Sequence, residues 1–109
     1  MRWIDIDLSA GRAEWKTVDE KLREQFIGGS GLGAFIAYRE KLWEHDPLSP
    51  GNMLIFAAGP FTGTKIPCSG RHALVSRSPL TGMFAESDVG GRWGVALVKC
   101  GIHLITVRG

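Results

Sequence analysis

The sequence predicts an α+β fold in which about three helices pack on a mixed or antiparallel sheet of about six strands. Short segments of alternating or continuous apolar residues are typical of strands, and other segments repeat apolar residues at helical spacing. The two kinds of segment do not alternate regularly, which argues against a doubly wound parallel sheet. Because 44% of the 109 residues are hydrophobic, residues 1–109 are expected to form one domain with its own core.

The N-terminal part predicts a β-hairpin followed by a short helix. Isoleucine and leucine alternate with aspartate over residues 4–8, and the alternation resumes over residues 12–17 after a turn that contains Gly11. Asp19 is a preferred helix-capping residue, and the glycines at positions 28–29 are expected to stop the helix that it begins.

The middle of the chain predicts one longer helix and then three strands. Apolar residues recur at helical spacing over residues 32–43, and a segment with two prolines and a glycine at 46–52 must be a loop. The run at 53–58 predicts a buried strand. Strands are also expected at 72–77 and 83–86, joined by a tight turn with proline and glycine.

The C-terminal part predicts a last helix and a last strand. From Gly91 onward apolar residues return to helical spacing, and Gly101 stands where a C-terminal cap belongs. Residues 103–107 form a final apolar strand. Since the chain stops at Gly109 directly after it, we expect a fragment or one piece of a split protein.

Charge and hydropathy exclude two classes of partner. The formal net charge is +2 and the basic residues are scattered, so no stripe suited to a nucleic-acid backbone is present. The longest apolar run, 53–58, is too short to cross a membrane, and residues 1–10 lack the apolar core of a signal peptide. We therefore expect a cytoplasmic protein that binds neither nucleic acid nor membranes.

The metal-ligating residue types are sparse. Cys68 and Cys100 have no second cysteine at ligand spacing, so this chain alone is expected to hold no zinc or iron–sulfur site. In a reducing compartment both are expected as free thiols, with Cys100 packed on a helix. His45, His72 and His103 are isolated and have no carboxylate or histidine partner at metal-ligand spacing.

A glycine-rich segment at 29–34, GSGLGA, fits the dinucleotide-binding pattern G-x-G-x-x-G/A. A true fingerprint follows a strand and opens the helix of a βαβ unit. Here a helix precedes it, so glycines that allow a tight turn and close packing explain the segment better. Backbone approach to another ligand is a third interpretation.

Two further loops could bind an anion. Asp88, Val89, Gly90 and Gly91 stand between a strand and a helix, whose first turn carries unpaired N–H groups that attract phosphate. The alternative is that Asp88 simply caps the helix. Arg71 closes a loop before another strand, and its planar guanidinium suits phosphate oxygens. An arginine at the start of a strand is, however, more often a solvated surface residue.

Several motifs occur together in one order. They are IDLSAGR, FIGGSGLGA, DPLSPGNMLIFAAGPFTGT, GRHALVSRSPLTG and GGRWGVALVKCG. In combination they resemble the N-terminal, tungstopterin-binding domain of the aldehyde ferredoxin oxidoreductases. The resemblance covers essentially all 109 residues, and it implies the first half of that domain.

The resemblance implies an enzyme that oxidises aldehydes to carboxylic acids and passes electrons to ferredoxin. Its cofactor would be a tungsten or molybdenum bis-pyranopterin with magnesium, beside a [4Fe–4S] cluster. The family's pterin-binding arginine falls on Arg71, and its next binding loop falls on Asp88, Val89 and Gly90, where many members have asparagine in place of Asp88. The cluster cysteines and the catalytic residues lie beyond Gly109, so no residue of this chain is expected to be catalytic.

Two functions from different classes follow. The first is the cofactor-binding part of a tungsten oxidoreductase, inactive without the rest of the protein or a partner subunit. The second is a non-catalytic assembly module that keeps the fold, for example as a homodimer whose two copies imitate the family's two halves. If the chain is half of a domain, an uncovered apolar surface should make it self-associate.

Overall fold

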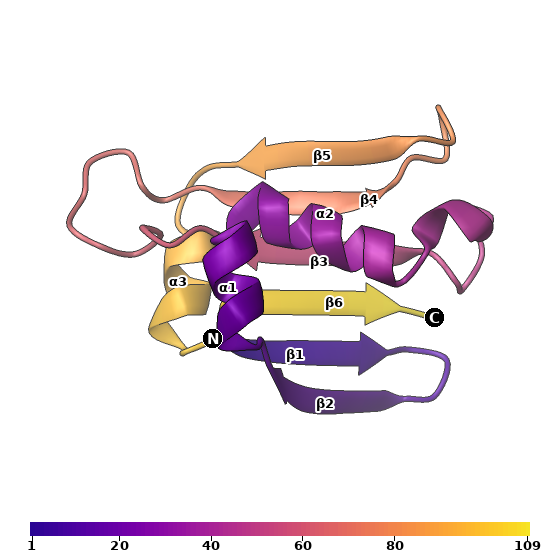
Figure 1. Ribbon diagram of the computed structural model, residues 1–109, viewed down its shortest axis with the longest axis horizontal. Coiled ribbons are helices and arrows are strands. Elements are labelled where there is room, and N and C mark those ends of the chain that lie inside the picture. The colour runs from indigo at the N-terminus through magenta and orange to yellow at the C-terminus, as the bar shows by residue number, and fades with distance from the viewer.

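The computed structural model describes all residues 1–109 and contains one six-stranded sheet with the strand order β2-β1-β6-β3-β4-β5 (Figure 1). The predicted α+β class, with six strands and three helices, is confirmed. The strands are β1 (Arg2–Asp7), β2 (Arg12–Thr17), β3 (Met53–Ala58), β4 (His72–Arg77), β5 (Phe84–Val89) and β6 (Leu104–Arg108), and the helices are α1 (Glu20–Phe26), α2 (Gly29–Arg39), α3 (Trp93–Lys99) and the 3₁₀ turn η1 (Leu42–Glu44).

The sheet is mixed because one of its five pairings is parallel. Strands β1 and β6 run parallel, whereas β1–β2, β3–β4, β3–β6 and β4–β5 are antiparallel. The hairpin between β1 and β2 turns at Gly11, which has φ +62°, a backbone angle that glycine adopts at little cost. Asp19 caps α1 as predicted, since its Oδ1 accepts a hydrogen bond from the N–H of Lys21 at 2.7 Å.

Helix α2 differs from the helix predicted at 32–43. It begins three residues earlier, at Gly29, and ends at Arg39, because Lys41 adopts a left-handed φ of +52° that interrupts the helix before η1. Its glycines serve packing. A Cβ at Gly33 would lie 2.8 Å from Cγ2 of Val75 on β4, so only glycine lets the helix lie this close to the sheet.

Strand β5 is longer than the predicted strand at 83–86 and extends to Val89. Ser87 and Asp88 are polar and lie beyond the end of the predicted strand. They are nevertheless paired with β4 in an unbroken register from His72 opposite Val89 to Arg77 opposite Phe84. The partner strand therefore sets the conformation here. Strand β6 is shifted by one residue from the prediction, to Leu104–Arg108.

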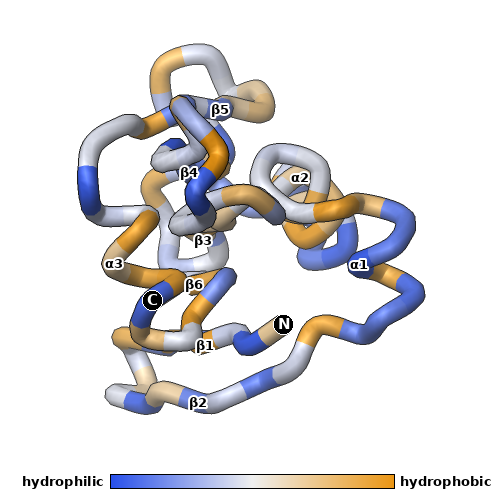
Figure 2. The backbone as a smooth tube through the Cα atoms, turned by 90° about the vertical axis from the view of Figure 1, so that its left-hand side faces the viewer, coloured by the Kyte–Doolittle hydropathy of each residue, from blue (hydrophilic) through white to orange (hydrophobic).

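Helices α1 and α2 cover one face of the sheet, and α3 lies against the other face at one end (Figure 2). The core lies under α2, where Leu32, Ile36, Ile55, Val75 and Leu104 are almost completely buried. No helix in the molecule is both long enough and apolar enough to cross a bilayer.

The second face of the sheet is apolar and mostly uncovered. One cross-strand row runs through Trp15, Ile4, Ile105, Phe56 and Leu74, which are neighbours in the strand register. Phe56 of this row packs against α3, through Trp93 at a ring distance of 5.2 Å. Trp15 remains 58% exposed. Contiguous exposed apolar side chains are common at surfaces that contact other proteins.

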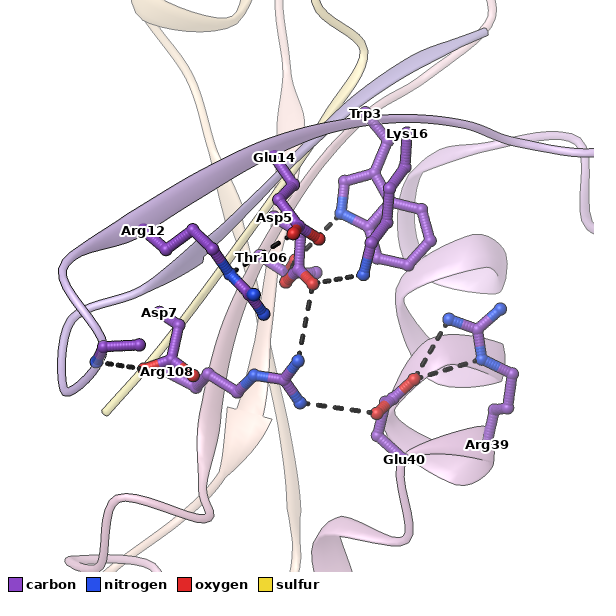
Figure 3. A network of polar contacts seen from close by, with 11 residues as sticks. Trp3, Asp5, Asp7, Arg12, Glu14, Lys16, Arg39, Glu40, Thr106 and Arg108 are labelled. Carbon is purple, nitrogen blue, oxygen red and sulfur yellow. Dashed lines mark hydrogen bonds and ion pairs between the residues drawn. The ribbon is translucent and has the colours of Figure 1, made fainter.

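A polar network with buried Asp5 and Thr106 at its centre lies beside the C-terminal end of α2 (Figure 3). Oδ1 of Asp5 accepts a hydrogen bond from Oγ1 of Thr106 at 2.6 Å, and this hydroxyl accepts one from Nε1 of Trp3 at 2.8 Å. Lys16 and Arg108 both pair with Oδ2 of Asp5. Burial alone raises the pKa of Asp5, but hydrogen bonds from Lys16 and Thr106 and the nearby positive charges outweigh it and lower the pKa.

We expect Asp5→Asn to lower the free energy of unfolding at neutral pH by about 1–3 kcal/mol, because charged hydrogen-bond partners lose their acceptor. The folded pKa lies below the ordinary value of 3.8, so the carboxylate stabilises the fold above that value. The contribution is lost as the pH falls through the folded pKa. Urea unfolding at pH 7 and pH 3 measures both effects: the difference between wild type and variant should shrink in acid. Asp7→Asn, at a more exposed turn aspartate, is the matched control. Equal stability of wild type and Asp5→Asn at pH 7 would contradict this assignment.

Candidate functional site

The predicted binding residues gather at the end of the sheet where β3 and β5 finish and β4 begins, on the left in Figure 1. Three segments meet there: the loop 59–71, the glycine turn at 90–91 before α3, and the glycine-rich start of α2. Such loop clusters on a rigid sheet are where binding residues are commonly placed.

Arg71 precedes β4 and lies beside the glycine turn. The register that pairs His72 with Val89 puts Arg71 next to Gly90, and a Cβ on Gly70 would lie 3.3 Å from the carbonyl oxygen of Gly91. Nη1 of Arg71 is 4.0 Å from Oδ2 of Asp88, and the two side chains are 69% and 55% exposed. Exposed pairs of this kind contribute little, so the guanidinium is available to another anion.

Asp88 and Val89 belong to strand β5, so the alternative interpretation of Asp88 as the cap of α3 is wrong. Arg92 occupies the N-cap position, and no side chain there donates or accepts a capping hydrogen bond. The reason is that pairing with β4 holds Asp88 in extended conformation, several residues before the helix. The carboxylate instead faces Arg71.

Gly90 and Gly91 leave open space around the turn. A Cβ built at either position would meet no atom within 4 Å, and Gly91 has φ +87°. Close packing within residues 1–109 therefore does not require a glycine at position 90. At position 91 the backbone angle φ favours glycine. Their main chain can be approached closely from outside.

The segment at 29–34 lies within α2 and is not a dinucleotide-binding loop. Helix α1, not a strand, precedes it, and Gly31 and Gly33 pack tightly against Phe26 and Val75. The interpretation as turn and packing glycines fits. Oγ of Ser30 donates a hydrogen bond to Oε1 of Glu86 on β5, and this bond ties the start of α2 to the same end of the sheet. No sequence pattern predicts this contact.

His72 supports the site from the second face of the sheet. It is 4% exposed, its ring lies 4.5 Å from that of Trp93, and burial lowers its pKa. A Cβ on Gly94 would lie 3.1 Å from its Nδ1. This contact sets α3, and with it the glycine turn, against β4. The role of His72 is therefore structural.

No group of three or more His, Cys, Asp or Glu side chains is placed to hold a metal ion. Cys68 and Cys100 are free and exposed, so the prediction that Cys100 packs in the interior is wrong. It lies at the C-terminal cap of the short helix α3, on the solvent side.

A shallow cavity of about 280 Å³ lies beside Arg71. Its walls include the exposed apolar side chains of Phe61 and Ile66. Together the site offers a free guanidinium, an accessible glycine main chain and apolar side chains. This combination suits a ligand that carries an anionic group and an apolar or ring-shaped part.

Comparisons with known proteins identify the family of this chain. The family model described as "Aldehyde ferredoxin oxidoreductase, N-terminal domain" matches residues 3–109. A tungsten-containing aldehyde ferredoxin oxidoreductase of Pyrococcus furiosus is 41% identical over 99% of this chain, and one of Pyrococcus horikoshii is 38% identical over 97%. The chain spans 18% of the length of each of these relatives.

The fold is also found in a solved structure, "Active site complex BamBC of Benzoyl Coenzyme A reductase in complex with 1,5 Dienoyl-CoA". The TM-score is 0.96 with 35% sequence identity, over 99% of this chain and 16% of that chain. An aliphatic sulfonate oxidoreductase subunit of Pyrococcus furiosus is 31% identical over 97% of this chain.

Proposed function

The chain belongs to the aldehyde ferredoxin oxidoreductase family, and we propose that it is the tungstopterin-binding N-terminal part of such an enzyme. The complete enzyme would oxidise an aldehyde to a carboxylate and pass the electrons through a [4Fe–4S] cluster to ferredoxin. The cofactor would be a tungsten, or molybdenum, bis-pyranopterin with magnesium. Residues 1–109 would form part of the base on which the cofactor rests.

The meeting of Arg71 with the open glycine turn at 90–91 is the observation that best supports this proposal. A phosphate-bearing pterin needs donors for its anionic oxygens and room close to the main chain. The exposed guanidinium supplies five N–H donors in a planar fork, and the turn has no neighbour within 4 Å of a Cβ at Gly90. The donor set and the free space therefore fit the group.

Each residue would then have a distinct role. Arg71 would bind pterin or phosphate oxygens and add positive charge near the cluster. The main chain of Asp88, Val89 and Gly90 would offer a carbonyl oxygen to the cofactor's magnesium, and the N–H groups before α3 would donate to phosphate oxygens. Asp88 would hold the guanidinium loosely until the cofactor binds. When bound, the cofactor supplies the two-electron oxidation and the route of the electrons to the cluster.

The chemistry itself would depend on the remainder of the protein. Two exposed cysteines cannot supply the four thiolates that a cubane cluster normally needs. The chain spans only 18% of the length of its relatives, so the substrate-side residues, the ferredoxin surface and the rest of the cofactor site would belong to another part of the protein or to a partner subunit.

The second candidate function, a non-catalytic assembly module, is favoured by the apolar second face of the sheet. The row from Trp15 to Leu74 could be covered by a second copy of the chain as well as by another part of a larger protein. Light scattering over a concentration series would reveal such a homodimer.

We expect tungsten and pterin in the complete protein purified from its native host, together with aldehyde-dependent reduction of ferredoxin. The isolated chain 1–109 should have neither iron nor activity. Elemental analysis and visible absorption of both preparations test this. A complete protein free of tungsten, molybdenum and pterin would contradict the first function. A metal-free homodimer that is the native form would establish the second.

A further inference from the structure

Thr62 joins the two ends of the loop that carries Arg71. Its side chain is buried, with 4% of the residue exposed. Its Oγ1 accepts a hydrogen bond from the N–H of Gly59 at 3.0 Å and donates one to the carbonyl oxygen of Arg71 at 2.8 Å. Gly59 follows the last residue of β3, and Arg71 precedes the first residue of β4. The hydroxyl thus closes the base of the loop 59–71.

Both hydrogen-bonding functions of this hydroxyl are used, one as donor and one as acceptor. The side chain of Arg71 has little to hold it, because its contact to Asp88 is 4.0 Å long and exposed. The direction in which the guanidinium leaves the sheet therefore depends on the main chain of Arg71. The paired register of β4 begins only at the next residue, His72, so the bond from Thr62 fixes the main chain of Arg71 just before the strand starts.

We propose that Thr62 is a positioning residue for Arg71. Its hydroxyl holds the carbonyl group of Arg71 close to the end of β3, and this fixes the direction in which the guanidinium points toward the proposed cofactor. This inference rests on the proposed function of Arg71. It adds a residue that touches no ligand itself, because its hydroxyl is occupied within the loop.

Thr64 in the same loop is a matched control. Its Oγ1 donates to the carbonyl oxygen of Phe61 at 2.7 Å and accepts from the N–H of Ile66 at 3.2 Å. It therefore makes the same number of hydrogen bonds as Thr62 and is exposed. Its bonds stay within the turn and do not reach Arg71.

The test is made in the complete enzyme, with tungsten and pterin per protein chain as the readout. Thr62→Val keeps the shape but removes the hydroxyl, and it should lower cofactor content up to about tenfold, the effect of one or two lost hydrogen bonds. Thr62→Ser keeps the hydroxyl and should restore most of the content. Thr64→Val should match wild type. If Thr62→Val does not accumulate, Thr62→Cys, whose thiol is a weak donor and acceptor, replaces it.

A double-mutant cycle separates positioning from general support of the fold. If Thr62 acts through Arg71, Thr62→Val should cause no further loss of tungsten in an Arg71→Ala background. Additive losses, or equal losses in Thr62→Val and Thr64→Val, would overturn the positioning role. Wild-type content in Thr62→Val with depleted content in Arg71→Ala would also overturn it and leave the proposed function intact. Wild-type content in Arg71→Ala would overturn both.

Discussion

Gly90→Val should abolish incorporation of the cofactor in the complete enzyme, while the isolated chain keeps its fold. The position is open, with no atom within 4 Å of a Cβ, and its φ lies outside the left-handed region. A valine there costs the chain little. It would fill the space through which a phosphate-bearing ligand approaches the main chain. Tungsten content of the enzyme and circular dichroism of the isolated chain measure the two expectations.

Two variants control this experiment. Gly90→Ala adds only one methyl group and should lose less cofactor than Gly90→Val. Gly91→Val lies next to it but imposes a side chain on φ +87°, so it should destabilise the isolated chain by about 1–3 kcal/mol. If Gly90→Val unfolds the isolated chain, the glycine serves the fold. If the enzyme with Gly90→Val binds tungsten normally, the turn does not contact the cofactor.

Arg71→Ala should lower cofactor occupancy or slow electron transfer in the complete enzyme. A charge-assisted hydrogen bond is typically worth about 1.5–3 kcal/mol, which corresponds to roughly ten- to a hundredfold in binding. Arg71→Lys should recover only part, because lysine keeps the charge and loses the planar fork. Tungsten content and turnover of the same preparations distinguish a binding defect from an electron-transfer defect.

Arg12→Ala is the charge-matched control for this series. Arg12 lies at the start of β2 and pairs with Glu14 at 3.2 Å, also on an exposed surface. The substitution Arg12→Ala removes one positive charge, as Arg71→Ala does, but leaves the loops around Arg71 unchanged. Wild-type tungsten content together with wild-type turnover in Arg71→Ala would show that Arg71 is a solvated surface residue.

Local signals in the sequence predicted most of the fold. Asp19 caps the start of α1 with its side chain, and Gly101 follows α3 with a positive φ that favours glycine. Both were predicted as helix ends. The apolar run at 53–58 became β3 with its predicted bounds. Arg71 was expected at the end of a loop, just before a strand, and its place immediately before β4 is confirmed. Its role in binding remains a prediction.

Features set by distant partners could not be predicted. The alternation over residues 4–8 indicates a strand but does not show which face of that strand the helices cover. Asp5 lies on the helix-covered face because Thr106 and Arg108 on β6 provide a hydrogen bond and an ion pair to its carboxylate. The polar end of β5 is a strand only because β4 pairs with it. The bond from Thr62 to Arg71 joins residues whose proximity follows from the pairing of β3 with β4.

The central claim is that Arg71 and the turn at 90–91 form one cofactor surface, and a crystal structure of the complete enzyme tests it most directly. We predict that the guanidinium of Arg71 and the main-chain N–H groups of residues 88–91 lie within hydrogen-bonding distance of the pterin or its phosphates. A cofactor bound elsewhere, with Arg71 in solvent and the space beside Gly90 filled by protein, would contradict it.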